Sequence, residues 1–336
     1  MKKDQFFNKV VVITGGTGGV GRATAHAFAA EGARVALLAR GQLDATKKEI
    51  EHLGGQALAI PTDVADPQQI ENAAGQIEKT FGPIDIWINN AMASVFAPIH
   101  EITPEEYKRV TEVTYLGQVY GAMTALRRMR PRNRGTIIFV GSALAYRGIP
   151  LQSAYCGAKH GIAGFYDSLR CELLHDRSKI HTCMVQLPAM NTTQFGWVLT
   201  RLPFQPRPMG KIYQPEVAAR AILYVAAHPR RSLWVGYSTY KAILGNYVAP
   251  GHADRVLART GYAGQQTDRP IQKDRENNVW QPVPEDRGTH GGFSLHATNK
   301  STTLWAAMHR RMVMVSAGLL GITAWLLRRK NNDPKA

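Results

Sequence analysis

The sequence predicts an α/β protein in which helices cover both faces of a doubly wound parallel sheet. Short apolar runs, typical of strands buried on both faces, alternate with helical patterns over the first two-thirds of the 336 residues. A glycine-rich turn at residues 14–21 also stands between the first apolar run and an Ala-rich helical stretch. A strand, a glycine turn and a helix N-terminus favour a dinucleotide site, because bare backbone amides and the helix dipole attract a pyrophosphate.

The expected elements follow one another in a regular order. Strands are expected at residues 10–13, 34–40, 57–61, 84–91, 135–142, 180–187 and 232–235. Helices are expected at residues 23–30, 43–53, 67–81, 103–130, 153–175 and 215–227. The stretch 188–209 is rich in Pro, Phe and Trp and has little periodicity, so we expect it to form a flexible lid over the substrate.

Composition narrows the class of protein. A chain of 336 residues with 44% hydrophobic residues suffices for one large α/β domain with an appendage, or for two small domains. The three cysteines, Cys156, Cys171 and Cys183, have neither metal nor redox spacing, which fits a reducing compartment and predicts no metal site. The first strand begins within ten residues of Met1, which leaves no room for a signal peptide.

The formal net charge is +16, and the excess is densest toward the end of the chain, with 16 Lys and Arg against 7 Asp and Glu in residues 228–336. The basic residues do not form an arginine-rich run interleaved with aromatics, so we expect no nucleic-acid partner. The excess of positive charge then has two interpretations. It is either an ordinary solvated basic surface or a surface that is attracted to an anionic membrane.

The ends of three strands carry candidate cofactor contacts. An acidic residue after the second strand would hold a ribose 2′-hydroxyl and select NAD, but Ala39 and Arg40 stand there. A guanidinium pairs with a 2′-phosphate, so NADP(H) is favoured over NAD(H); the alternative is an ordinary exposed arginine. Asp63 can accept from an adenine amino group or cap the next helix. Asn89 and Asn90 can tie neighbouring strand ends together.

Ser142, Tyr155 and Lys159 are the candidate catalytic residues. Tyr155 and Lys159 are four residues apart on a predicted helix, hence on one face, and Ser142 ends the preceding strand. An ammonium near a phenol, together with a positive nicotinamide, lowers the phenol pKa and lets Tyr155 exchange a proton with an alcohol or carbonyl. Ser142 can hydrogen-bond the same substrate oxygen, and the cofactor supplies the hydride.

With these pieces the sequence resembles the short-chain dehydrogenase/reductase family, in its TGxxxGxG/YxxxK subgroup, over roughly residues 8–240. The matching motifs are Thr14-Gly15-x3-Gly19-x-Gly21, Asp63, Asn89-Asn90-Ala91, Ser142-x12-Tyr155-x3-Lys159 and Pro188-x3-Thr192. The resemblance implies a Rossmann-like fold and an NAD(P)-dependent oxidoreductase that interconverts an alcohol and a carbonyl. It assigns Tyr155 as acid/base and Ser142 as substrate-orienting. Lys159 would lower the tyrosine pKa and hold the nicotinamide ribose, with Thr192 near the carboxamide.

The predicted site is therefore the following. The catalytic residues are Ser142, Tyr155, Lys159 and Thr114. The cofactor-binding residues are Thr14, Gly15, Thr17, Gly18, Gly19, Val20, Gly21, Arg40, Asp63, Val64, Asn90, Ala91, Tyr155, Lys159, Pro188 and Thr192. We also expect a homo-oligomer.

Three positions depart from the family pattern. Many members carry Asn at the position of Thr114, where it holds a water in a proton relay; a hydroxyl can hold a water too, so we still expect activity. Met92 replaces the usual Gly after Asn-Asn-Ala and is expected to narrow the pocket, and Ala189 replaces the Gly of Pro-Gly.

Residues beyond 240 extend the family core. We divide the chain into a domain at 1–240, an extended arm at 241–303 and a C-terminal apolar helix at 304–330. Short helices are expected at 237–247 and 252–259, separated by Pro250. Residues 265–300 are polar and contain Gly and Pro, so they are expected either to lie on the surface or on a partner subunit, or to be disordered.

Residues 312–327 contain no charge over 16 residues and have basic residues on both sides. No polar stripe recurs at helical spacing, and a helix of this length reaches about 24 Å, against a hydrocarbon core of about 30 Å. Snorkelling arginines and terminal tryptophans can cover the difference, so a membrane anchor is favoured over a buried helix. We expect the enzyme domain on the cytoplasmic face of that membrane.

Two functions remain. The first is an NADPH-preferring oxidoreductase that acts on an apolar substrate. This substrate class is suggested by apolar residues in the lid, namely Phe195, Trp197, Leu199, Leu202, Phe204 and Met209. The alternative is that these side chains only pack the lid against the domain. The second is a nucleotide-binding, membrane-associated interaction protein with little or no turnover. Intact Ser142, Tyr155 and Lys159 favour the first.

Overall fold

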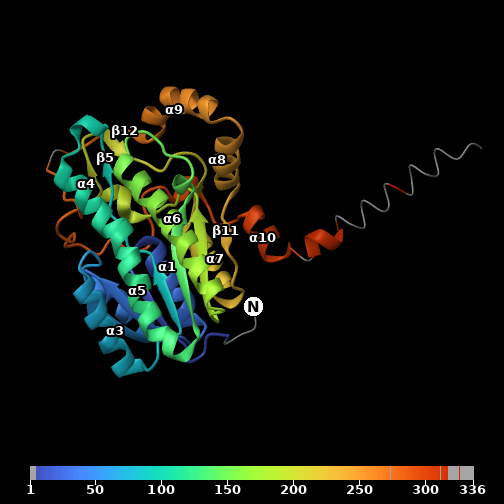
Figure 1. The fold of residues 1–336 in the computed structure, drawn as a ribbon. Helices are drawn as coiled ribbons and strands as arrows, with labels where there is room; N and C mark the ends of the chain where they lie inside the picture. The colour runs from blue at the N-terminus through green and yellow to red at the C-terminus, as the bar shows by residue number, and fades with distance from the viewer. Residues whose placement is uncertain (1–4, 273, 311, 317–324, 326–336) are drawn as a thin grey trace, which may run out of the picture.

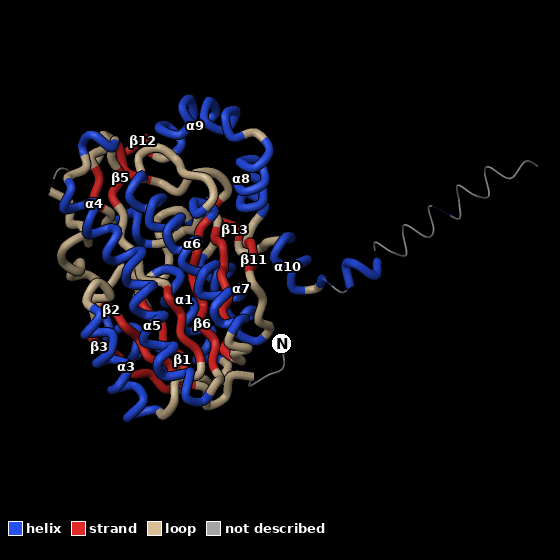
Figure 2. Tube along the Cα trace, viewed as in Figure 1, coloured by secondary structure: helices blue, strands red, loops and turns tan. Residues whose placement is uncertain are grey.

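The computed structural model describes residues 5–272, 274–310, 312–316 and 325. Within this part of the chain, a seven-stranded parallel sheet has the strand order β11-β7-β6-β4-β1-β2-β3 and helices on both faces (Figures 1 and 2). The strands are β1 (Val10–Thr14), β2 (Arg34–Ala39), β3 (Gln56–Pro61), β4 (Ile86–Asn89), β6 (Gly135–Ser142), β7 (Ile180–Leu187) and β11 (Ser232–Trp234). The predicted α/β class with a doubly wound sheet is confirmed.

Two hydrophobic cores fill the space between the sheet and its helices. One face packs against α1 (Gly19–Ala30), α2 (Leu43–His52) and α7 (Pro215–Ala227). The other packs against α3 (Pro67–Phe81), α5 (Gly117–Met129) and α6 (Ser153–His175). The central strands are apolar on both sides because both faces are covered: all five residues of β1 are buried.

The chain order reverses at the middle of the sheet, and this reversal places the site. Strand β1 pairs with β2 on one side and with β4 on the other. The connections on the two sides of β1 therefore run in opposite directions, which opens a crevice at the carboxyl ends of these strands. The glycine turn after β1, Arg40 after β2 and Asn90 after β4 all come to this crevice.

The predicted helix at 103–130 is interrupted in the structure. It begins at α4 (Pro104–Thr111), where Thr103 and Glu106 form a capping box. A π-helical turn at Glu112–Leu116 then leads into α5. Such turns insert an extra residue into a helix and are frequent at functional sites. Thr114 lies in this turn. The sequence pattern indicated a continuous helix here and gave no sign of the π-helical turn.

The stretch 188–209 is held at two places by strand pairs. Strand β8 (Leu199–Thr200) pairs with β5 (Val95–Phe96), and β9 (Phe204–Pro206) pairs with β12 (Gln266–Pro270) of the C-terminal extension. Phe195 and Leu202 are buried in one cluster with Phe96, Leu151 and Val198. The packing interpretation holds for Leu202, whereas Phe195, Trp197 and Met209 all line the cavity described below.

The C-terminal extension returns to the domain. Its expected helices are present as α8 (Tyr237–Val248) and α9 (Pro250–Gly264), with Pro250 as the first residue of α9. Strand β13 (Ala297–Thr298) pairs with β10 (Ile212–Tyr213). Helix α10 (Thr302–Met308) packs on the core through Leu304, which is 3% exposed. Short 3₁₀ helices lie at Ile99–Glu101, Arg130–Arg132, Ala143–Ala145, Thr193–Gly196 and Ser294–His296.

The described residues contain no helix that is both long enough and apolar enough to cross a bilayer. Most of the apolar segment predicted as an anchor, including residues 317–324 and 326–330, lies outside the described residues. The anchor therefore stays a prediction.

Candidate active site

A cavity of about 800 Å³ lies at the carboxyl ends of the strands. Its walls include the glycine turn, Arg40, Asn90 and the predicted catalytic residues Ser142, Tyr155 and Lys159. Of the predicted cofactor residues, Thr14 and Gly21 lie behind the wall, and the others line it. Met92 and Ala189, the two departures from the family pattern next to strand ends, line it as well.

Close packing at the glycine turn explains two of its glycines. Gly15 has φ +65°, and a Cβ there would lie 2.9 Å from Ala91 Cα. A Cβ on Gly21 would lie 2.0 Å from the Gly15 carbonyl oxygen. Any side chain at Gly21 would thus push the start of α1 away from the turn. The turn keeps the first amides of α1 at the cavity, an arrangement that fits the pyrophosphate of a dinucleotide.

The side-chain amide of Asn90 ties the ends of β1 and β4 together. Its Nδ2 donates to the carbonyl oxygens of Thr14 (3.0 Å) and Gly15 (3.1 Å). In return, Thr14 Oγ1 accepts from the backbone amides of Asn90 (2.9 Å) and Ala91 (3.1 Å). The predicted tie is confirmed for Asn90. Asn89 instead accepts from the Trp87 indole at 2.9 Å, on the buried side of the sheet.

The structure brings Ser142, Tyr155 and Lys159 together. Ser142 ends β6, where its Oγ accepts from the Leu144 amide at 3.1 Å, and its side chain lies close enough to the Tyr155 hydroxyl to favour the ionised form of that group. Lys159, one turn along α6 from Tyr155, places Nζ 5.5 Å from the centre of the tyrosine ring. The same Nζ donates to the Val140 carbonyl at 2.7 Å, and the lysine is 2% exposed.

Burial shifts the pKa values of both Tyr155 and Lys159. Loss of water raises the pKa of Tyr155 well above its ordinary range, and the hydrogen bond from Ser142 opposes this shift only in part. Burial lowers the pKa of Lys159 to about 7. In the protein alone, desolvation therefore raises the pKa of Tyr155. The expected lowering includes the positive charge of a nicotinamide, and it stays a prediction.

Thr114 has partners other than the expected water. Its Oγ1 donates to the Ala93 carbonyl at 2.8 Å and accepts from the Ala93 amide at 2.9 Å. The side chain is fully buried and does not reach the cavity wall. It fastens the π-helical turn to the loop after β4, and its part in a proton relay stays a prediction.

Asp63 and Arg40 both line the cavity and both have partners. Asp63 accepts from the Ala65 amide at 3.0 Å and forms an ion pair with Arg109. The Arg40 guanidinium donates to carbonyl oxygens of the C-terminal extension, at Asn278, at Val279 (3.4 Å) and at Trp280 (2.9 Å). The extension thus reaches the end of the site where the ribose of a dinucleotide is expected.

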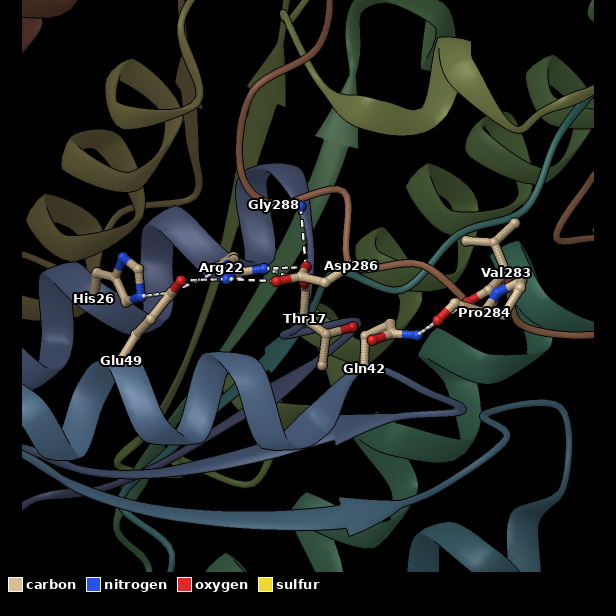
Figure 3. A network of polar contacts seen from close by, with 9 residues as sticks. All are labelled: Thr17, Arg22, His26, Gln42, Glu49, Val283, Pro284, Asp286 and Gly288. Atoms are coloured by element: carbon tan, nitrogen blue, oxygen red, sulfur yellow. Dashed lines mark hydrogen bonds and ion pairs between the residues drawn. The ribbon is translucent and has the colours of Figure 1, made fainter.

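A second network at this end escaped the sequence analysis. Arg22, in the first turn of α1, lies between Glu49 of α2 and Asp286 of the extension (Figure 3). Arg22 and Asp286 are 264 residues apart in the chain. The sequence offered one signal for this network, the charged Arg22 directly after the last glycine of the turn. The helix pattern does not assign this position to a buried or an exposed face.

The low pKa of Lys159 predicts a pH dependence of stability. Between pH 7 and the ordinary lysine pKa, the unfolded chain holds a proton that the folded chain has released, so stability rises with pH. We expect Lys159→Met to reduce this slope by up to about 1.4 kcal/mol per pH unit between pH 7 and 8.5. Urea unfolding across this range checks it. The exposed control Lys79→Met should keep the parental slope, and an unchanged slope in Lys159→Met contradicts the assignment.

Comparisons with known proteins agree with this geometry. Residues 9–200 match the short chain dehydrogenase family. An uncharacterized oxidoreductase of Bacillus subtilis (strain 168), YxnA, is 29% identical over 336 residues, which cover 98% of this chain and 93% of that protein. Dehydrogenase/reductase SDR family member 7B of Bos taurus is 36% identical over 174 residues, about half of each chain (49% of this one and 54% of that protein).

Two further matches cover about two-thirds of the chain. A 3-dehydrosphinganine reductase of Danio rerio is 29% identical over 223 residues, or 63% of this chain and 67% of that protein. A crystal structure of a metagenomic short-chain oxidoreductase in complex with NADP superposes with a TM-score of 0.58 at 24% identity. It covers 68% of this chain and 97% of that one, and it shows the shared fold. The chain therefore belongs to the short-chain dehydrogenase/reductase family of NAD(P)-dependent oxidoreductases.

Proposed function

We propose that this protein is an NADPH-preferring oxidoreductase that interconverts an alcohol and a carbonyl on an apolar substrate. The observation that carries the proposal is the meeting of Ser142, Tyr155 and Lys159 in the same cavity as the glycine turn. A nucleotide-binding protein without turnover would need the turn but not this trio. We therefore favour an enzyme over the interaction protein.

The residues of the trio divide the chemistry. The nicotinamide cofactor supplies or accepts the hydride when it is bound. Ser142 and Tyr155 both line the cavity, and in this proposal their hydroxyl groups hold the substrate oxygen between them. The Tyr155 hydroxyl gives that oxygen its proton in the reducing direction and takes it in the other. Lys159 lies under the ring, and its charge stabilises the phenolate that forms when the proton leaves.

The NADPH preference is supported at the end of β2. Ala39 takes the place where an acidic residue would select NAD, and Arg40 lines the cavity next to it. In the part of the chain that the structure describes, Arg40 forms no ion pair: its partners are backbone carbonyls, and the nearby Asp63 is bound to Arg109. A guanidinium whose charge is not neutralised by a carboxylate is suited to a phosphate.

The apolar substrate is supported by the other end of the cavity. Its walls there include apolar side chains from the loop after β6, from the lid and from α9: Leu144, Ile149, Met209, Val256 and Leu257. Arg207 and Lys241 line the same cavity. A test panel should therefore contain hydrophobic aldehydes and ketones both with and without a carboxylate at the far end.

The role of Tyr155 predicts a split between binding and turnover. We expect Tyr155→Phe to bind NADPH with nearly parental affinity and to lose about 10²–10⁴-fold in kcat, because it lacks only the transferable proton. NADPH oxidation with the carbonyl panel and NADPH fluorescence titration measure the two effects. Equal rates in variant and parent contradict the role. NADPH binding without oxidation by any member of the panel favours the interaction protein.

The role of Arg40 predicts a cofactor-specific effect. We expect Arg40→Ala to raise the KM for NADPH at least tenfold more than the KM for NADH, because only NADPH carries the 2′-phosphate. The two KM values are measured with one carbonyl substrate. An equal rise for both cofactors means that Arg40 serves only to hold the C-terminal extension, which contradicts the NADPH preference.

We also propose that residues 312–327 attach the enzyme to the cytoplasmic face of a membrane. The support is the uncharged run between two basic clusters, together with the exposed Met312, Val313, Met314 and Val315. A chain ending at residue 310 keeps α10 and its buried Leu304 on the domain. We expect the full chain, but not this shortened chain, to sediment with phosphatidylserine vesicles in high salt. Equal sedimentation of both chains contradicts the anchor.

A further inference from the structure

Residues 278–288, here called the cover segment, lie across the cofactor end of the cavity. On one side the cavity is lined by Gly18 and Arg40, and on the other by Val283, Asp286 and Gly288 of this segment. The glycine turn, the end of β2 and the cover segment thus line one cavity together. The family match ends at residue 200, so this wall lies outside the matched region.

Among the contacts that hold the cover segment against the domain, three come from α1 and the end of β2, through Arg22, Arg40 and Gln42. The Arg40 guanidinium donates to the carbonyls at its start, including that of Trp280 at 2.9 Å. The Gln42 side-chain amide donates to the Val283 carbonyl (3.4 Å) and to that of Pro284 in its middle (Figure 3). All of these acceptors are backbone carbonyls, so the contacts fix the path of the chain.

The third contact is an ion pair at the end of the segment. Asp286 binds Arg22 through both carboxylate oxygens, with Oδ2 at 3.1 Å from Nη2. On its other side Arg22 Nε donates to Glu49 at 2.9 Å, and the arginine is only 3% exposed. Hydrogen bonding to Arg22 lowers the pKa of Asp286 below its ordinary value, so the carboxylate is charged at neutral pH. A buried arginine held between two carboxylates is costly to leave with one of them missing.

The ion pair is linked to the glycine turn. Asp286 Oδ1 accepts from the Gly288 amide at 3.0 Å, and the Gly288 carbonyl in turn accepts from the Gly19 amide at 3.3 Å. Gly19 is the first residue of α1, where free amides are offered to phosphate oxygens. The Gly288 carbonyl and a phosphate oxygen would compete for that amide. Occupation of the turn by a dinucleotide is thus coupled to the position of the cover segment.

We propose that the cover segment is an outer wall of the cofactor site, that Arg22 is a positioning residue that holds it closed through Asp286, and that the dinucleotide enters and leaves only when this contact opens. The proposal rests on dinucleotide binding at the glycine turn. It does not depend on the preference for NADPH or on the substrate.

The test is the rate of cofactor exchange in Asp286→Asn, which keeps the shape of the side chain and removes its charge. We expect NADPH association and dissociation both to accelerate about tenfold, as for the loss of one charged hydrogen bond, while Kd changes less than either rate. Stopped-flow fluorescence measures association, and displacement by excess NADP⁺ measures dissociation. Asp286→Glu should recover most of the parental rates.

A matched control makes the same chemical change elsewhere in the extension. Asp268 is exposed on β12, and Asp268→Asn should leave both rates at the parental values. Gln42→Asn, whose shorter side chain withdraws the second contact, should accelerate both rates in the same direction and keeps the proposal testable if Asp286→Asn folds poorly.

Three results would overturn the proposal. Parental rates in Asp286→Asn and Gln42→Asn would show that the cover segment does not control exchange. Faster association with unchanged dissociation would show that it obstructs only the empty site. Because the test measures binding rates, its outcome is independent of the proposed reaction. If the parent protein exchanges NADPH but reduces no carbonyl, the proposed reaction fails and the role of the cover segment still stands. A parent that binds neither NADPH nor NADH overturns both.

Discussion

The hydrogen bonds of the Asn90 side chain are the constraint on which the site depends. They join the ends of β1 and β4, the two strands between which the direction of the sheet connections reverses. With this tie in place, Gly15 passes Ala91 too closely for any side chain, and the first amides of α1 stay turned toward the crevice. The carboxyl ends of β6 and β2 then supply Ser142 and Arg40 to the same cavity.

Desolvation of the catalytic side chains is a second physical constraint on the site. Tyr155 and Lys159 lie where water is scarce, and burial shifts the pKa of each toward its neutral form. In such surroundings an added positive charge acts strongly, because little solvent screens it. The tyrosine can therefore be neutral and stable in the resting protein and still become a proton donor and acceptor once the nicotinamide is in place.

Local patterns predicted most of the fold and the centre of the site. The strands around β1 and the helices after them follow from apolar runs and capping residues, and Tyr155 and Lys159 share a face because they are four residues apart. The sequence did not predict features that depend on distant parts of the chain. The ion pair of Arg22 with Asp286 and that of Asp63 with Arg109 join segments whose proximity no local pattern encodes. The rise of the Tyr155 pKa in the protein alone depends on burial, which no local pattern encodes.

The C-terminal extension contacts both ends of the cavity as one continuous chain. Helices α8 and α9 border the end away from the glycine turn, β12 pairs with the lid, and the cover segment borders the glycine turn. A single stretch of chain therefore borders both the place proposed for the nucleotide and the place proposed for the organic substrate.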